Sequence, residues 1–257
     1  MRRSRVIFAS VVAVTGLVVG IAAVDALRPN AVAESQSRAS VIDIERLNEA
    51  LAGQGSVGDA HFLDCTLSET LPNFAIAWDG EPGQRIFEAT IDGMVSGARP
   101  GSGHRESVGG DDTVEREILG FEDKTAYWRT VVLSVEVLND FDSEADMPSE
   151  IKVVLWLDGA TDPAVILRGL PGQRIFAVLE APGRLEPSDA YPVARNGALI
   201  GVVSDDGALS LPGLDVYEDG YMDGLTTLSA IETASEAPMT VLPLSTANGY
   251  WERTDCS

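Results

Sequence analysis

Residues 125–138 alternate between apolar and polar side chains with a period of two, which is typical of a β-strand with one buried face. Residues 151–158 repeat this alternation. The apolar positions of the two stretches are Tyr127, Val131, Leu133, Val135 and Val137, and then Ile151, Val153, Leu155 and Leu157. Two such stretches predict strands that cover one side of a hydrophobic core.

Shorter apolar runs predict further strands along most of the chain. They cover residues 60–67, 73–78, 85–95, 114–120, 164–168, 173–180, 198–203 and 239–244. Two long polar breaks interrupt them: residues 96–113 hold five glycines, and residues 139–150 hold five acidic residues. This pattern predicts a mainly β fold, built as an antiparallel barrel or sandwich.

Two segments instead show the spacing of short helices. Ser40 can cap the first helix, with Asp43 three residues further on and a stop at Gly53. Asp223 can cap the second. Their apolar positions are Ile44, Leu47 and Leu51 in the first, and Leu225, Leu228 and Ile231 in the second. The apolar stripe of the second is typical of a helix packed on the core.

The N-terminal segment combines a basic flank with an uncharged apolar run. Arg2, Arg3 and Arg5 precede Val6–Val24, a run of 19 residues without charge, and Ala31-Val32-Ala33 follows. A small-x-small site after an apolar run is typical of a cleaved secretory signal. A run of this length also suits a membrane-spanning helix, with the basic end in the cytoplasm. Both interpretations place the rest of the chain outside the membrane.

This segment divides the chain into three predicted parts. Residues 1–33 are the signal peptide or transmembrane anchor, residues 34–58 a linker with a short helix, and residues 59–257 a single β-rich extracytoplasmic domain. We expect a single-pass membrane protein with an extracytoplasmic C-terminal domain, or a secreted protein if cleavage follows Ala33.

The charge of the chain narrows the classes of partner. The formal charge is −22, and residues 1–33 hold four arginines and one aspartate, so the remainder carries −25. Such a charge repels phosphate backbones and anionic lipid surfaces, which argues against nucleic acid and against membrane contact beyond the N-terminal segment. A basic partner or another envelope protein fits the charge better. The sequence does not indicate the oligomeric state.

The chain has two cysteines, Cys65 and Cys256. In an oxidising compartment a lone pair of cysteines is most simply a disulfide. A zinc site is the competing interpretation. It would have to use both cysteines together with His61 and His104, because the chain has no other histidine.

One short motif occurs twice. Residues 80–87 and residues 169–176 match at seven of eight positions, and both contain Pro-Gly-Gln-Arg-Ile-Phe. Pro-Gly suits the centre of a type II turn, and the following residues suit an outgoing strand. The two copies place Arg85 and Arg174 equivalently, which would suit an anionic ligand. Two similar turn-to-strand junctions without a site explain the motif equally simply.

From about residue 85 to residue 211, the predicted strands and loops follow one another in a characteristic order. A strand ending in Val95 is followed by a loop, a long strand ending in Leu138, an acidic loop, a strand, the strand 172–180 and a hairpin at Asp206-Gly207. This order resembles that of small OB-like β-barrels, related in shape to the netrin and tissue-inhibitor modules, that occur in bacterial envelope proteins. The resemblance implies a binding or scaffold unit.

No catalytic residues can be assigned from motifs. The chain lacks Gly-x-Ser-x-Gly, Ser-x-x-Lys, His-Glu-x-x-His and a phosphate loop. We expect His104, which lies among glycines, to be a solvated loop residue. The densest acidic cluster contains Asp215, Asp219 and Asp223, and oxygen-rich loops of this kind can hold calcium, although the spacing is not that of a helix-loop-helix site. Apart from calcium, no cofactor is indicated.

Two functional hypotheses follow. The first is an exported, membrane-anchored module of the cell envelope with a non-catalytic binding or scaffold role and an unidentified ligand. The second is an extracellular hydrolase that uses carboxylates from different strands. The absence of catalytic motifs favours the first.

Overall fold

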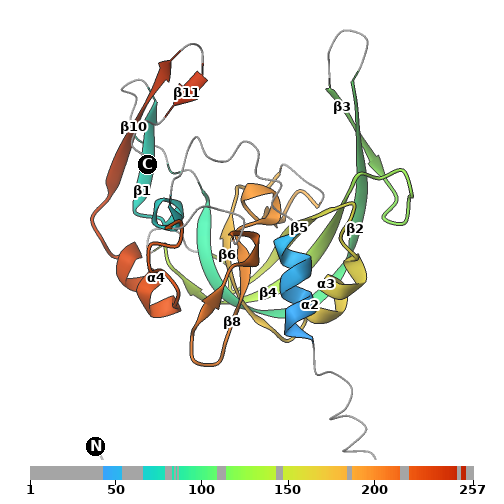
Figure 1. Cartoon of the computed structure of the whole chain (residues 1–257), viewed down its shortest axis with the longest axis horizontal. Helices are drawn as coiled ribbons and strands as arrows, with labels where there is room; N and C mark the ends of the chain where they lie inside the picture. Colours follow the sequence, from blue (N-terminus) through green and yellow to red (C-terminus); the bar gives the residue numbers. More distant parts are fainter. Residues whose placement is uncertain are drawn as a thin grey trace, which may run out of the picture. The chain divides into compact units, whose positions relative to one another are not determined.

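Figure 1 shows a computed structural model of the chain. It describes residues 43–53, 66–78, 83, 85, 87–108, 114–142, 147–183, 187–214, 220–247 and 250–252. These residues belong to one compact unit, Ile42–Ser257. The predicted N-terminal signal or anchor lies outside the described residues. None of the helices in the described part of the chain is long and apolar enough to cross a membrane.

The larger sheet has eight strands. Its strands pair in the order β7-β5-β4-β2-β6-β8-β9, and β3 pairs with β2 outside this path. The bounds are β2 Ala89–Val108, β3 Val114–Leu119, β4 Trp128–Asp140, β5 Glu150–Asp158, β6 Arg174–Leu179, β7 Tyr191–Pro192, β8 Ile200–Val203 and β9 Leu209–Ser210. The prediction of a mainly β fold is confirmed.

The two strands with the clearest alternation, β4 and β5, pair antiparallel along nine residues of each, from Trp128 opposite Asp158 to Glu136 opposite Glu150. The core between this face of the sheet and the helices contains the predicted apolar positions Val131, Leu133, Val135, Ile151, Val153, Leu155 and Leu157. Tyr127 is an exception: it precedes β4 and is 57% exposed. The even-numbered residues of β4 and β5 form the opposite face of the sheet, which we call the outer face.

Strand β2 extends far beyond its predicted end at residue 95. It runs to Val108, through the glycine-rich segment that was predicted to be a loop, and pairs there with β4 and then with β3. Its pairing with β4 shifts register near Gly93, Gly97 and Gly103. Glycines inside a strand often mark bulges and close backbone contacts, so here they bend the strand and do not end it.

The prediction of a barrel is wrong, because the sheet is not closed. Strand β7 has two residues, and Pro192 has no N–H group with which to extend a ladder. A single bridge between Leu179 and Val193 joins β6 to the segment after β7. One bridge is too short a pairing to complete a ring of strands.

The described residues contain three α-helices, one more than the predicted maximum: α2 Ile44–Ala52, α3 Pro163–Gly169 and α4 Leu228–Ser235. The predicted strand at residues 164–168 is wrong and is replaced by α3, which begins at a proline after the N-cap Asp162. Asp43 caps α2, and Thr227, in place of the predicted Asp223, caps α4. Ser40 lies outside the described residues.

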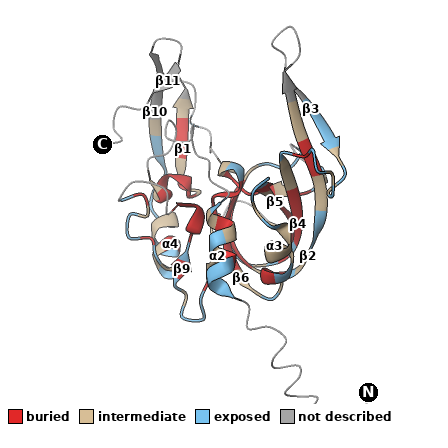
Figure 2. Ribbon diagram, turned by 45° about the vertical axis from the view of Figure 1, so that its right-hand side comes forward, coloured by how far each residue is buried: buried red, intermediate tan, exposed pale blue. Residues whose placement is uncertain are grey.

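Helices α2 and α3 lie side by side against the sheet (Figure 1) and complete the first core with Leu47, Leu51, Ile166 and Leu170. A second core lies on the other face of β6 and β8, where Phe176 and Val178 pack with Leu199, Tyr221 and Ile231 of α4. Figure 2 shows these buried segments on both sides of β6. Because both faces of β6 are buried, polar side chains in this region need partners.

The remaining elements are short. Strands β1 Phe74–Trp78, β10 Thr240–Ala247 and β11 Tyr250–Glu252 form a separate three-stranded sheet, in which β1 and β10 run parallel. Three 3₁₀ helices cover Leu67–Thr70 (η2), Arg195–Gly197 (η3) and Pro212–Leu214 (η4). Helix η2 adds Leu67 to the second core. The predicted strand at residues 60–67 lies outside the described part, except for its last two residues, and Leu67 is helical.

Candidate functional site

Arg174, one of the two arginines in the repeated motif, pairs with a fully buried carboxylate. Its Nε and Nη2 atoms donate to Oδ1 and Oδ2 of Asp92 at 2.7 and 2.6 Å. Asn139 donates to Oδ2 of the same carboxylate at 2.6 Å. The Asp92 side chain has no exposed surface, whereas Arg174 is 33% exposed. This pair joins β2, β4 and β6 at the edge of the second core.

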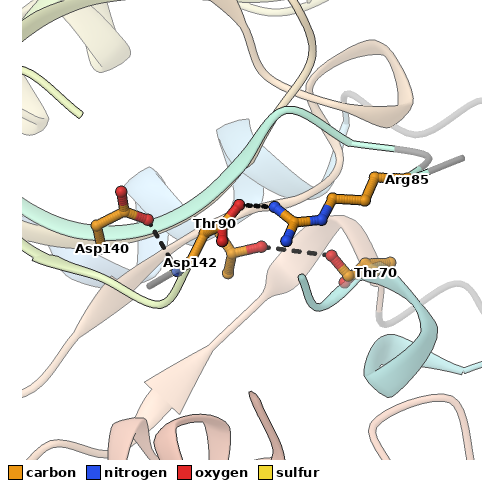
Figure 3. A network of polar contacts seen from close by, with 5 residues as sticks. All are labelled: Thr70, Arg85, Thr90, Asp140 and Asp142. Carbon is orange, nitrogen blue, oxygen red and sulfur yellow. Dashed lines mark hydrogen bonds and ion pairs between the residues drawn. The ribbon is translucent and has the colours of Figure 1, made fainter. Parts of the chain in front are cut away.

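Arg85, the other arginine of the motif, also pairs with a buried carboxylate. Its guanidinium contacts Asp142, whose side chain is 2% exposed (Figure 3). The backbone N–H of Asp142 donates to Oδ1 of Asp140 at 2.9 Å. Thr90 donates to the backbone oxygen of Thr70 at 3.3 Å in the same network. The network connects the start of β2, the end of β4 and the segment around Arg85.

The repeated motif therefore provides the same interaction twice. Each copy places an arginine against an aspartate that is distant in sequence and buried. A bidentate or buried arginine–carboxylate pair holds segments in one arrangement. Each guanidinium keeps a partly exposed side, and the binding of an anion by Arg85 or Arg174 stays a prediction.

The acidity of Asp140 departs clearly from that of a free carboxyl. Burial raises its pKa to about 6, although the backbone N–H of Met147 and the guanidinium of Arg85 act in the opposite direction. Asp140 lies at the end of β4, where its Oδ1 accepts from Asp142. A carboxyl with a pKa near neutrality can act as a proton donor, but it also lowers stability while it is ionised.

Replacing Asp140 by asparagine should therefore stabilise the protein at pH 8 and not at pH 4. The folded-state pKa is raised, so the contribution of Asp140 to stability is complete below pH 4 and is lost as the pH rises through 6. We expect a gain of about 1–2 kcal/mol at pH 8, discounted for the water that reaches this half-buried group. Urea unfolding of both proteins at the two pH values measures it.

Asp123→Asn is the control for this measurement. Hydrogen bonds from Thr125 lower the pKa of Asp123, so the loss of its charge should not stabilise the protein at pH 8. An equal gain for Asp140→Asn at both pH values would contradict the assignment of a raised pKa.

The other predicted sites are only partly described. Asp215 and Asp219 lie outside the described residues, as do Cys65, Cys256 and His61. Asp223 lies in a turn, has a φ of 49°, and accepts from the hydroxyl of Ser68 at 2.9 Å. Within the described ranges, no three His, Cys, Asp or Glu side chains are grouped as metal ligands would be. The calcium site and the disulfide remain predictions.

A groove lies near the start of β5, where it is lined by outer-face residues of β4 and β5 and also by Val135 and Ile151 of the first core. It encloses about 500 Å³. Its polar lining consists of Ser96, Ser134, Glu150, Lys152, Asp189 and Tyr191. We call these residues the outer groove. They come from β2, β4, β5, the segment before β7 and β7 itself, so the groove exists only because the sheet brings these strands together.

The outer groove carries both signs of charge. Lys152 donates to Oδ2 of Asp189 at 2.5 Å, and both side chains are exposed. The hydrogen bond from Lys152 lowers the pKa of Asp189, and Arg99 adds a smaller effect in the same direction. Hydroxyl, ammonium and carboxylate groups at one surface can bind a polar ligand through several hydrogen bonds.

Trp128 and Trp156 lie on the same outer face, further along β4 and β5, and Tyr127, which precedes β4, is next to Trp128. The rings of Trp128 and Trp156 lie 5.9 Å apart in an edge-to-face arrangement, and Tyr127 lies 6.2 Å from Trp128. His104 stacks on Trp156 at 5.3 Å. We call Tyr127, Trp128, Trp156 and His104 the aromatic patch. Arg116 of β3 lies over Trp156, 6.0 Å from its centroid.

The prediction that His104 is a solvated loop residue is wrong. His104 lies in β2, is 3% exposed, and its Nε2 is 2.8 Å from the hydroxyl of Ser102. Burial and then the charge of Arg116 lower its pKa. The aromatic patch was not predicted from the sequence. A signal was present, because Trp128 and Trp156 occupy positions on the polar faces of the two alternating stretches.

The described geometry is suited to binding. The buried carboxylates Asp92 and Asp142 are held by arginines. The outer face presents partly exposed tryptophan rings and the mixed polar lining of the outer groove, together with exposed residues such as Glu136, Leu138 and Asp158. No family model, no curated protein and no solved structure matches this chain.

Proposed function

We propose that this protein is an exported, membrane-anchored module of the cell envelope with a non-catalytic binding role, and that its ligand contacts the outer face of β4 and β5. The observation that carries the proposal is the outer groove, with its exposed Lys152–Asp189 pair and its hydroxyl groups. Its volume falls in the range of ligand sites in proteins.

The order of the strands gives a second support. β2 pairs with both β4 and β6, β4 pairs with β5, and β5 pairs in parallel with β7. Helix α3 lies between β5 and β6 in the chain. This order, though not a closed ring of strands, resembles that of OB-like modules, which serve as binding units on many proteins. The likeness supports a binding role in general and does not identify the ligand.

Export remains part of the proposal and rests on residues 1–33. The basic flank, the uncharged run and the Ala31-Val32-Ala33 site support it. The N-terminal residue of the mature protein distinguishes the two forms: the protein begins at Glu34 if the signal is cleaved after Ala33 and retains the apolar run if it is an anchor.

Removing the charged pair of the outer groove should weaken ligand binding about tenfold. The variant is Lys152→Ala/Asp189→Ala, in which both changed side chains are exposed, so the fold should be kept. The full-length protein in detergent is mixed with cell-wall and membrane fractions of its own organism, and the retained fraction is measured against protein concentration.

The matched control is Lys124→Ala/Glu122→Ala, which removes one exposed charge of each sign from the turn before β4. It should bind as the unchanged protein does. Equal retention of all three proteins, or retention of none, would argue against binding at the outer groove.

The hydrolase is the second candidate, and Asp140 is the observation that favours it. A carboxyl with a pKa near 6 has the acidity of a general acid. The same envelope fractions provide the test. Release of soluble fragments that grows with time and is lost in Asp140→Asn would support the hydrolase, whereas retention without release supports the binding module.

A further inference from the structure

We infer that the aromatic patch is a binding site for an uncharged glycan, a chain of neutral sugars that stacks on the exposed ring of Tyr127 and the partly exposed ring of Trp128. This inference rests on the proposed function and names the ligand class. It begins from the exposure of the rings: Tyr127 is 57% exposed and precedes β4, while Trp128 and Trp156 are partly exposed on β4 and β5. The C–H groups on one side of a sugar ring make an apolar surface that fits an aromatic face.

The rings are held in place by the strands beneath them. Trp128 and Trp156 belong to paired strands, and His104 stacks on Trp156 from β2. The position of His104 is set in turn by Ser102, whose hydroxyl also lies 3.3 Å from the hydroxyl of Thr130. Aromatic side chains on a rigid sheet lose little conformational entropy when a ligand binds. The patch is therefore preorganised.

Polar groups adjoin the rings on β3. Arg116 lies over Trp156, and its Nε donates to Glu106 at 2.7 Å. The side chain of Arg116 is 61% exposed and that of Glu106 is 30% exposed. A guanidinium and a carboxylate next to an aromatic face can donate to and accept from neighbouring hydroxyls of a sugar.

Charge decides between ligands that stack on aromatic rings. Nucleic-acid bases also stack on such rings, but the chain after residue 33 carries −25, which repels a phosphate backbone. Next to the patch, Arg116 and Glu106 form an ion pair without net charge, and the acidic residue Asp158 lies opposite Trp128 on β5. An uncharged ligand avoids the repulsion that a polyanion would meet.

The aromatic patch and the outer groove lie on one face of β5. Lys152 and Trp156 are four residues apart on this strand, which places them on the same face, about 13 Å from each other. Ala190 packs on Val132 and Val154 between them and is fully buried. Trp156 packs against the same cluster and the neighbouring Asp189 lines the outer groove, so the segment before β7 contacts both sites.

The test is affinity electrophoresis of the full-length protein in detergent, in gels that contain hydroxyethylcellulose, laminarin, mannan or arabinogalactan, together with pelleting on insoluble chitin. At least one of these should retain the protein. Tyr127→Ala and Trp128→Ala should each weaken retention about tenfold or more. Addition of the retained glycan, or of its short oligosaccharides, should also change the tryptophan fluorescence.

Leu138→Ala is the matched control, because Leu138 is an exposed apolar residue on the same strand, 45% exposed and away from the rings. It should behave as the unchanged protein does. Circular dichroism melting shows whether Trp128→Ala is folded, and the exposed Tyr127 gives a variant that should keep its fold.

Three results would overturn the inference. The first is that none of these glycans retains the protein while its binding to envelope fractions still depends on Lys152 and Asp189, in which case the proposed function stands alone. The second is that the Tyr127 and Trp128 variants lose a protein partner and no glycan, which would make the patch a protein interface. The third is that neither glycans nor envelope fractions bind, which would remove both proposals.

Discussion

Replacing Asp92 by alanine should lower the free energy of unfolding by about 3–5 kcal/mol, because it leaves Arg174 without its buried carboxylate. Asp92 accepts two hydrogen bonds from Arg174 and one from Asn139, and its side chain has no exposed surface. Removing one partner of a buried charged pair costs far more than the pair itself contributes. For a domain of this size we expect the melting temperature to fall by roughly 10 °C.

Two further variants make this result specific. Glu117→Ala removes a partner of Arg105 from an exposed cross-strand pair and should leave the melting temperature almost unchanged. The double variant Asp92→Leu/Arg174→Met replaces both charges by apolar groups and should recover most of the loss. A fall for Asp92→Ala no larger than that for Glu117→Ala would show that the buried pair does not hold β2, β4 and β6 together.

Replacing Gly101 by alanine should destabilise the protein by about 1–3 kcal/mol, because no space exists for the added carbon. A Cβ atom at this position would lie 2.2 Å from the hydroxyl oxygen of Thr130 and 2.8 Å from its backbone oxygen. Thr130 is fully buried in β4 and donates to the backbone oxygen of Ser102, so it cannot move away without losing this bond. Chemical unfolding measures the loss.

Gly97→Ala is the matched control in the same strand. A Cβ atom at Gly97 would meet nothing within 4 Å, so alanine should be tolerated or slightly stabilising. Equal losses for both variants would mean that β2 needs glycine for its flexibility and not for close contact. Ser102 contacts both His104 and Thr130. Gly101→Ala should therefore also weaken the binding of a ligand to the aromatic patch.

The function proposed for this chain depends on side chains that different strands bring together. The outer groove draws on β2, β4, β5 and β7, and the aromatic patch draws on β2, β4 and β5. The proposed function therefore depends on the large sheet, and the two variants above test the stability of that sheet. Binding measurements on the groove and on the patch then test separate parts of one face.

Local patterns were sufficient for part of the fold. The alternation in residues 125–138 and 151–158 identifies β4, β5 and their buried faces, because a period of two assigns each side chain to one face. The same patterns failed at residues 96–108 and at residues 164–168. In the first segment the glycines lie within a bent strand and do not form a loop. In the second, the short apolar run follows the N-cap Asp162 and begins with Pro163, and these two residues favour a helix over a strand.

By itself the sequence determined the mainly β character of the domain, the faces of its clearest strands and the repetition of an arginine at two turn-to-strand junctions. Only the tertiary structure decided the partners of those arginines, because Arg174 and Asp92 are 82 residues apart and Arg85 and Asp142 are 57 residues apart. It also decided the burial of His104 and the gathering of Tyr127, Trp128 and Trp156. The physical reason is that periodicity sets the face of a residue, whereas its neighbours depend on strand order, register and bulges that distant segments set together.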